Sequence, residues 1–303
     1  MKTRPILINI TGPTASGKTA VAIDVAKALN TEIISADSRQ IYKEMSVGTA
    51  VPSEEELKAV KHHFIRSISI TESFSAGDFE QRSLKIIEKL GKTKRYIVMA
   101  GGTGLYFNAV NFGLDNIPGI PGNIRKELTE TLNRQGIETL RKELRDKDPV
   151  YFAQVDKNNP HRLIRALEVI RHTGKPFSIF RKQVPKPRFF QSRWFGLHWP
   201  RDVLYERINR RVEQMIDKGL IDEARKLYPY KHFNALQTVG YRELFDFFDG
   251  KISLEEAVEE IKKNTRRYAK RQLTWFKKNP DIRWIDMQKE NPVQIILESL
   301  INL

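Results

Sequence analysis

The chain has 303 residues, of which 40% are hydrophobic, so it can bury the core of one large domain or two linked domains. Its 52 lysines and arginines outnumber 37 aspartates and glutamates, and the resulting charge of +15 favours a polyanionic partner, with nucleic acid as the first candidate and an anionic membrane surface as the second. The lack of cysteine excludes disulfides, thiolate metal sites and a cysteine nucleophile, and no apolar run approaches the roughly 18 residues that span a bilayer, so we expect a cytoplasmic protein without a membrane partner.

A glycine-rich loop near the start of the chain separates a predicted strand at residues 6–10 from a predicted helix at residues 18–29. It fits the pattern Gly-x4-Gly-Lys-Thr and comprises Gly12, Pro13, Thr14, Ala15, Ser16, Gly17, Lys18 and Thr19. Glycines let the backbone amides converge on an anion, Lys18 adds a positive charge, and Thr19 offers a hydroxyl to a phosphate-bound Mg²⁺. The loop therefore predicts binding of a diphosphate or triphosphate, and the alternative is a plain turn between strand and helix.

Asp37 follows the second predicted strand, residues 32–36. Residues just past the carboxyl ends of strands face the ligand crevice of a doubly wound sheet, so Asp37 should point at the ligand of the loop. Three roles are open to it: a general base, a Mg²⁺ ligand through water, and the N-cap of the next helix.

Residues 53–63 combine a helix-capping signature, which begins at Ser53, with the pair His62 and His63. We assign the two histidines no metal, because adjacent imidazoles on a helix point in different directions.

The third predicted strand, residues 96–100, ends in Gly101 and Gly102 rather than in an aspartate. A nucleotide hydrolase commonly carries a Mg²⁺-binding aspartate there, so the glycines argue against a motor-type ATPase and leave Asp37 as the carboxylate nearest the phosphates. The glycines permit close approach of a ligand, with the Thr103 hydroxyl beside it, or form a plain helix-entry turn.

The predicted secondary structure changes after residue 113, where short helical patterns follow one another without strands. We assign residues 114–198 to a mainly helical insertion domain and residues 1–113 and 199–303 to the core, although residues 189–198 read as a strand that returns to the sheet. One helix of the insertion carries His161, Arg162 and Arg165, with Leu163 and Ile164 on its buried face.

Two helical patterns near the C-terminus carry arginine and lysine. Residues 201–218 present Arg207, Arg210 and Arg211, which are available to a phosphate or lie on a solvated face. Residues 262–278 carry eight basic residues and no acidic one. On one face lie Lys263, Arg266, Arg267, Lys270 and Arg271, and opposite them Val258, Ile261, Tyr268 and Trp275 should seat the helix on the core. The basic face suits a nucleic-acid backbone, whereas an ordinary solvated helix usually alternates charge sign.

A final strand at residues 282–286 and a helix at residues 292–300 close the pattern. The predicted fold class is α/β, a P-loop NTPase-like parallel sheet flanked by helices, with the helical insertion between its halves.

Six motifs occur in the order found in tRNA dimethylallyltransferases, also called tRNA isopentenylpyrophosphate transferases, and the chain resembles this family over almost its whole length. The motifs are GPTASGKT (12–19), DSRQIY (37–42), GGTGLY (101–106), RLIRALE (162–168), VGYR (239–242) and KRQLTWF (270–276). Their ordered co-occurrence is far more specific than the phosphate loop alone.

The resemblance implies transfer of a dimethylallyl group from dimethylallyl diphosphate to N6 of the adenine at tRNA position 37, 3′ of the anticodon, with release of diphosphate. It implies that the loop, Lys18, Arg211 and Mg²⁺ on Thr19 stabilise the leaving group, and that Asp37 is the base. The tRNA contacts that it implies are Asp37, Ser38, Arg39, Gln40, Thr103, Arg125, His161, Arg162, Leu163, Ile164 and Arg165. To these we add Arg242, Lys263, Arg267 and Lys270 from the basic C-terminal helices.

Two other functions use the same features. A small-molecule or nucleoside kinase would hold ATP on the loop, and a non-catalytic RNA-binding protein would keep a nucleotide as a structural ligand. We expect the protein to be a monomer that binds the anticodon stem-loop of tRNA and dimethylallyl diphosphate.

Overall fold

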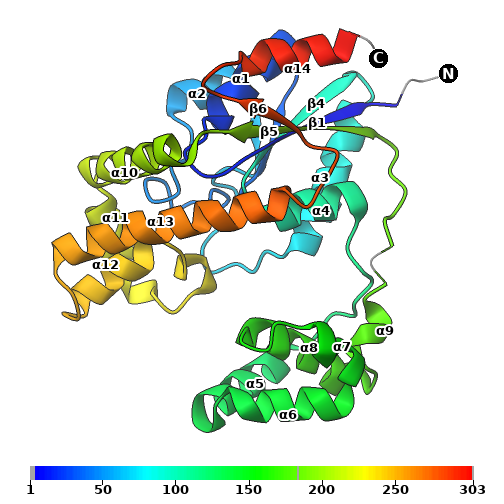
Figure 1. Cartoon of the computed structure of the whole chain (residues 1–303), viewed down its shortest axis with the longest axis vertical. Helices are drawn as coiled ribbons and strands as arrows, with labels where there is room; N and C mark the ends of the chain where they lie inside the picture. The colour runs from blue at the N-terminus through cyan, green and yellow to red at the C-terminus, as the bar shows by residue number, and fades with distance from the viewer. Residues whose placement is uncertain (1–3, 183, 302–303) are drawn as a thin grey trace. The chain divides into compact units, whose positions relative to one another are not determined.

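The computed structural model describes residues 4–182 and 184–301 and divides the chain into two compact units (Figure 1). One unit is formed by the residues up to Asn111 and those from Pro187 onward, and the other by Phe112–Lys186. Each is described below by itself.

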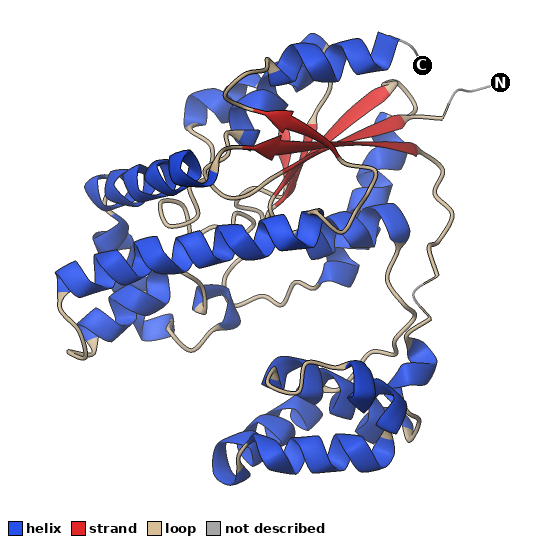
Figure 2. Cartoon of the chain, in the orientation of Figure 1, coloured by secondary structure: helices blue, strands red, loops and turns tan. Residues whose placement is uncertain are grey.

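A parallel six-stranded sheet forms the centre of the first unit (Figure 2). Its order is β3 (His62–His63), β2 (Ile33–Ala36), β4 (Tyr96–Gly101), β1 (Ile6–Thr11), β5 (Gln191–His198) and β6 (Arg283–Asp286). All six residues of β1 are buried, as expected for a parallel strand covered on both faces. The expected α/β class is therefore confirmed.

One element and one domain boundary differ from the sequence-based expectation, whereas the returning strand is present as expected. His62 and His63 form the short edge strand β3, paired with Ile33 and Ile34, so our placement of these histidines on a helix is wrong. A two-residue strand is too short to show an alternating pattern. Strand β5 pairs with β1 from Gln191 to Gly196, which places residues 191–198 in the sheet and ends the second unit at Lys186 rather than at residue 198.

Helices cover both faces of the sheet (Figures 1 and 2). Helices α1 (Lys18–Ala28) and α14 (Pro292–Ile301) share one apolar cluster with β1, β4 and β5. On the other face lie α3 (Ala76–Leu90), α4 (Gly104–Phe112) and α13 (Leu254–Phe276). There the ring of Phe107 lies 5.7 Å from that of Trp194 in β5 and 5.7 Å from that of Phe276 in α13. Aromatic packing thus fixes α13 against the sheet.

Helix α13 begins eight residues earlier than the basic segment that predicted it. The helix begins with a capping box. The Ser253 side chain accepts from the amide of Glu256, and the Glu256 side chain accepts from the amide of Ser253. The first turns are acidic, and Glu259 and Glu260 pair with Lys262 and Lys263. The full helix therefore carries both charge signs, and only its second half is purely basic.

Helices α10 (Arg201–Asp217) and α12 (Tyr241–Phe248) lie beside α13, and α11 (Leu220–Leu227) packs against both of them. The short helix α2 (Glu54–Ala59) lies next to α1, and the 3-10 helices η1 (Tyr228–Tyr230) and η2 (Asn234–Leu236) lie between α11 and α12 in the chain. None of the helices within the described ranges is both long and apolar enough to cross a membrane.

The second unit is a helical bundle with its own core. Its helices are α5 (Gly122–Gln135), α6 (Ile137–Lys147), α7 (Pro149–Gln154), α8 (Pro160–Thr173) and α9 (Phe177–Phe180). Helix α8 packs against both α5 and α6, and Asn159 caps it by accepting from the amide of Arg162. A buried apolar cluster along α8 therefore organises this bundle.

Candidate active site

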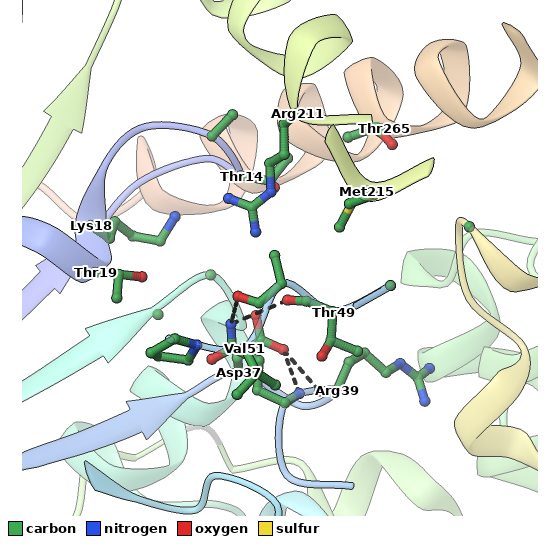
Figure 3. A pocket seen from close by; sticks show the side chains of 18 of the residues that line it. Thr14, Lys18, Thr19, Asp37, Arg39, Thr49, Val51, Arg211, Met215 and Thr265 are labelled. Carbon is green, nitrogen blue, oxygen red and sulfur yellow. Dashed lines mark hydrogen bonds between the residues drawn. The ribbon is translucent and has the colours of Figure 1, made fainter. Parts of the chain in front are cut away.

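The carboxyl ends of three neighbouring strands meet at one cavity. Gly101, the last residue of β4, is paired with Thr11 at the end of β1 and with Ala36 at the end of β2. The loops that follow these strands consequently start side by side, as the parallel topology requires. They line a cavity of about 1290 Å³ together with residues of α10 and α13 (Figure 3).

The glycine-rich loop and the start of α1 line this cavity. Helix α1 starts at Lys18 without a side-chain cap, so its first N–H groups remain available to an anion. Two carbonyls of the loop accept hydrogen bonds from side chains that follow β5. Trp199 Nε1 donates to Ser16 O at 3.1 Å, and Arg207 Nε donates to Ala15 O at 3.0 Å. The Ser16 hydroxyl is buried without a hydrogen-bond partner among the residues described. These features suit a phosphate group.

Lys18 and Arg211 point into the same space from opposite elements, α1 and α10 (Figure 3). Burial, followed by the charge of Arg211, lowers the pKa of Lys18 to about 7, against the opposing effect of Asp37. Burial also lowers the pKa of Arg211, and Asp37 again opposes the shift. Two cations forced together at partial burial would be stabilised by a multiply charged anion between them.

Asp37 lines the cavity and also closes the turn after β2. Its Oδ1 accepts from the amide of Arg39 at 2.8 Å and from that of Gln40 at 3.3 Å. Both bonds end on the same oxygen, so Oδ2 takes no part in the turn. Asp37 therefore closes a turn, and the N-cap alternative is wrong because residues 38–50 contain no helix; Oδ2 is left for chemistry.

The neighbours of Asp37 are tied to other loops. The amide of Ser38 donates to the Thr103 hydroxyl at 3.0 Å, which links the ends of β2 and β4. The Arg39 guanidinium donates to the carbonyls of Asn234 and Ala235, and the Gln40 amide group donates to those of Thr49 and Ala50. The Asp37 turn is therefore held in place by contacts on three sides.

The glycines after β4 accommodate protein rather than ligand. A Cβ on Gly102 would lie 2.1 Å from Nε2 of Gln272, and one on Gly104 would lie 2.1 Å from Cδ1 of Trp275. Side chains of α13 occupy the space next to both glycines, so our expectation that the space admits a ligand is wrong at these two positions. From its place opposite the basic face we expected Trp275 to lie in the core. This expectation is wrong, because its side chain is 38% exposed.

The basic residues that we assigned to tRNA in the first unit differ in their surroundings. Arg242 is exposed and lines the cavity. Lys263 forms an ion pair of 2.6 Å with Glu260, whereas Arg267 and Lys270 are exposed and form no ion pair with a carboxylate within residues 4–182 and 184–301. Arg267 and Lys270 are consequently the freer cations of this helix.

In the second unit the assigned residues fall into two groups. His161 and Arg162 are exposed at the start of α8, while Arg125 and Arg165 both pair with the buried carboxylate of Glu168. Leu163 is fully buried and Ile164 is 5% exposed, so neither side chain can touch RNA and both serve the core of this unit. A contact of these two residues with tRNA would have to come from the backbone, because α8 turns their side chains inward.

A further set of contacts around Glu223 carries no sequence signal. The Glu223 carboxylate accepts from the amides of Ser46, Val47 and Gly48 at 2.8–2.9 Å and from the Tyr241 hydroxyl at 2.6 Å. Burial and the Glu223 charge raise the pKa of Tyr241, so its hydroxyl stays protonated and donates. This carboxylate fixes residues 46–48, which line the cavity.

Oxygen groups for a cation are sparse at the cavity. No group of three or more histidines, cysteines, aspartates and glutamates with metal-binding geometry occurs in the part of the chain that is described. The Thr19 hydroxyl and the Asp37 carboxylate nevertheless line the cavity next to the loop (Figure 3). This donor set fits Mg²⁺, which usually takes one or two protein ligands and completes its shell with water and substrate phosphate.

Known proteins resemble this chain over nearly its whole length. The sequence model of the family described as IPP transferase matches residues 40–279. A tRNA dimethylallyltransferase of Christiangramia forsetii is 53% identical over 98% of this chain and 98% of that protein, and one of Flavobacterium johnsoniae is 46% identical over 97% and 98%. The solved structure of the full-length tRNA isopentenylpyrophosphate transferase from Bacillus halodurans is 41% identical, with a TM-score of 0.71, and the match covers 99% of this chain and 96% of that chain. A eukaryotic dimethylallyltransferase acting on tRNA is 24% identical and shares the fold, with a TM-score of 0.79 over 98% of this chain and 80% of that chain.

Proposed function

Because this chain belongs to the IPP transferase family, we propose that it transfers the dimethylallyl group of dimethylallyl diphosphate to N6 of the adenine at tRNA position 37, 3′ of the anticodon. The observation that carries the proposal is the convergence of Lys18, Arg211 and Asp37 on one cavity beside the glycine-rich loop. Two cations and one carboxylate are what departure of an anionic group and deprotonation of an amine require.

The cations act on the leaving group. As the bond between the allylic carbon and the diphosphate oxygen breaks, negative charge accumulates on that oxygen. The N–H groups of the loop and of α1, with Lys18 and Arg211, are placed to stabilise this charge. The loop backbone is held before the substrate arrives, because Trp199, Arg207 and Gln272 bind it.

We propose that Thr19 holds Mg²⁺, with Asp37 near enough to contribute through water. When bound, the metal ion would neutralise charge on the diphosphate oxygens. Lys18 and Arg211 supply the remaining positive charge for the diphosphate.

Asp37 acts on the acceptor. As N6 of adenine forms its bond to the allylic carbon, the amine becomes cationic and must lose a proton. Oδ2 of Asp37 is the oxygen that the turn leaves unused, and we assign it to take this proton. The diphosphate departs with the electrons of the broken carbon–oxygen bond, so the charges balance.

The acceptor base must leave its stack to reach the cavity, since the N6 group of a stacked adenine cannot reach a carboxylate inside a cavity. The cavity is lined by nine lysines and arginines and by four carboxylates, a balance that favours a polyanion. We propose the anticodon stem-loop of tRNA as that polyanion, with Arg242, Arg267 and Lys270 among its contacts.

The decisive experiment incubates the protein and unmodified tRNA with either dimethylallyl diphosphate labelled in its allyl group or ATP labelled in its γ-phosphate. Label should move to tRNA from the first donor only, and only with tRNA that carries the adenine. Transfer of the γ-phosphate to any acceptor would support a kinase, and binding without transfer from either donor would support a non-catalytic RNA-binding protein.

A further inference from the structure

Trp275 is a large aromatic side chain that the catalytic arrangement does not use. It lies on α13 and is 38% exposed, although aromatic residues of this size are mostly covered in a folded core. Leu105, which directly follows Gly104, is 46% exposed. An exposed tryptophan next to an exposed leucine calls for an explanation.

The indole is held in place from one side. Its five-membered ring lies against the backbone of Gly104, because a Cβ there would be 2.1 Å from Cδ1 and 2.3 Å from Nε1. One turn earlier on the same helix, Gln272 binds both the carbonyl of Gly102 and the amide of Thr14. Helix α13 is thereby fixed to two loops of the site, and the orientation of Trp275 is fixed with it.

The ring lies one helical turn from residues that line the catalytic cavity. Gly101, Gly102, Arg271 and Gln272 line that cavity, and Trp275 lies three residues beyond Gln272, one helical turn further along α13. A molecule that extends out of the cavity past Gly102 would therefore meet the indole.

The charge at the end of α13 indicates what that molecule is. Arg271, one turn before Trp275, and Lys277 and Lys278, which follow the helix, are exposed, and none of them forms an ion pair with a carboxylate in the described part of the chain. Unpaired cations near an aromatic ring disfavour an apolar protein surface and favour a phosphate backbone. Fixed aromatic rings surrounded by lysine and arginine are the usual platform for unpaired bases.

We propose that Trp275 is a stacking platform for an unpaired base adjacent to the acceptor adenine, which it holds outside the cavity while the adenine enters. The inference rests on the proposed function, because it takes the acceptor to be RNA. It assigns to Trp275 a binding role and leaves the chemical step to the groups inside the cavity.

The test compares Trp275→Ala, Trp275→Leu and Trp275→Phe in binding of an anticodon stem-loop RNA. Stacking on one base predicts that Trp275→Ala binds the RNA about 5- to 150-fold more weakly, with Trp275→Phe close to the native protein and Trp275→Leu close to the alanine variant. Affinity for dimethylallyl diphosphate should be unchanged in all three, which also shows that the loop is intact. Trp284→Phe is the matched control, since that indole also lies on a glycine, Gly196, but in the sheet at β6.

A second arm identifies the base. Stem-loops with a single abasic site on the 5′ or the 3′ side of the acceptor adenine are bound by native protein and by Trp275→Ala, and the loss caused by the mutation should disappear for one of the two RNAs. A loss that is equal for every RNA, or a leucine variant that binds as well as phenylalanine, would overturn the stacking role. So would unchanged RNA affinity together with a Trp275-dependent association with anionic lipid vesicles. Failure of the native protein to prenylate any tRNA would instead count against the proposed function itself.

Discussion

Gln272 Oε1 accepts a hydrogen bond from the backbone amide of Thr14 at 2.8 Å, and this contact joins the basic helix α13 to the phosphate loop. The same side chain donates through Nε2 to the carbonyl of Gly102 at 3.0 Å. One buried amide group therefore connects the loops after β1 and β4, and the helix that carries Trp275 is connected to the diphosphate site.

Gln272→Ala should weaken binding of dimethylallyl diphosphate and lower the free energy of unfolding by about 1–3 kcal/mol, since it leaves the Gly102 carbonyl unpaired. Gln272→Glu keeps an acceptor for Thr14 but loses the donor and adds a negative charge beside the loop, so its affinity for the diphosphate should fall further than its stability. Calorimetric titration and urea unfolding measure the two effects. Equal diphosphate affinity in all three proteins would show that the contact does not shape the loop.

Asp37→Asn should separate the structural role of this side chain in the turn from its role as a base. Asparagine can still accept from the amides of Arg39 and Gln40, so the unfolding temperature should stay near the native value. The single-turnover rate of transfer should fall by roughly 10²- to 10⁴-fold, because the amide cannot take the proton, while affinity for dimethylallyl diphosphate stays the same. Asp37→Ala is the comparison that loses the turn as well.

The other two roles of Asp37 predict different outcomes in the same experiment. Recovery of the Asn variant at high Mg²⁺ would make Asp37 a metal ligand, and a near-normal rate throughout would leave it only the role of closing the turn.

Lys18 should make diphosphate binding depend on pH. Its pKa is lowered to about 7 in the free protein, so the side chain is largely charged below pH 7 and increasingly neutral above it. A bound diphosphate favours the ammonium form and raises that pKa, so binding above pH 7 takes up a proton and affinity falls by up to about tenfold per pH unit. Below pH 7 the charge is already present and Lys18 contributes no further dependence.

Calorimetry at pH 8 in two buffers with different ionisation enthalpies measures the proton uptake directly. Lys18→Arg is the control, because its guanidinium is charged throughout and only the titration of the ligand remains. Identical uptake in the two proteins would remove Lys18 as its source.

Much of the phosphate site could be predicted because its signals are local. The glycine pattern with Lys18 and Thr19 and the apolar run before it determine a strand, a loop and a helix within two dozen residues. The placement of Asp37 followed from a general property of parallel sheets, in which carboxyl ends share one edge. Helical spacing offered Arg207, Arg210 and Arg211 together, the family resemblance selected Arg211, and all three line the cavity.

The remaining features depend on how distant elements pack, which spacing does not show. The periodicity of α13 places Trp275 on its apolar side, yet the bulk of Phe276 and the contact of Gln272 with the loops set the rotation of the helix and leave Trp275 at the surface. Glu223 has the ordinary spacing of an exposed acidic residue in a short helix, and only the folded chain brings residues 46–48 to it.

The salt dependence of tRNA binding should follow ion pairing rather than charge count. Each phosphate contact contributes roughly 0.7–0.9 to the slope of log affinity against log salt, so Arg267→Ala with Lys270→Ala should flatten it by up to about two such contributions. Lys263→Ala should change the slope less, because Glu260 already neutralises that ammonium. Filter binding between low and physiological salt measures the slopes.

Lys92→Ala is the control for the salt experiment, since this exposed lysine precedes β4 at the amino edge of the sheet. An equal effect of Lys92 and of the two α13 residues would indicate nonspecific attraction to the whole +15 charge.

The contact of Glu223 with Tyr241 should be measurable as a coupling between stability and substrate binding. Tyr241→Phe removes one of the four bonds to the carboxylate and should cost about 1.5–3 kcal/mol, as for a hydrogen bond to a charged group, while Glu223→Ala frees the loop at residues 46–48 and should cost more. Because that loop lines the cavity, Glu223→Ala should also raise KM for dimethylallyl diphosphate. Tyr241→Phe made in the Glu223→Ala background should then cost almost nothing, since the partner of the hydroxyl is already gone. Urea unfolding of the four proteins gives the coupling energy, and additive costs would mean that the two side chains stabilise the fold independently.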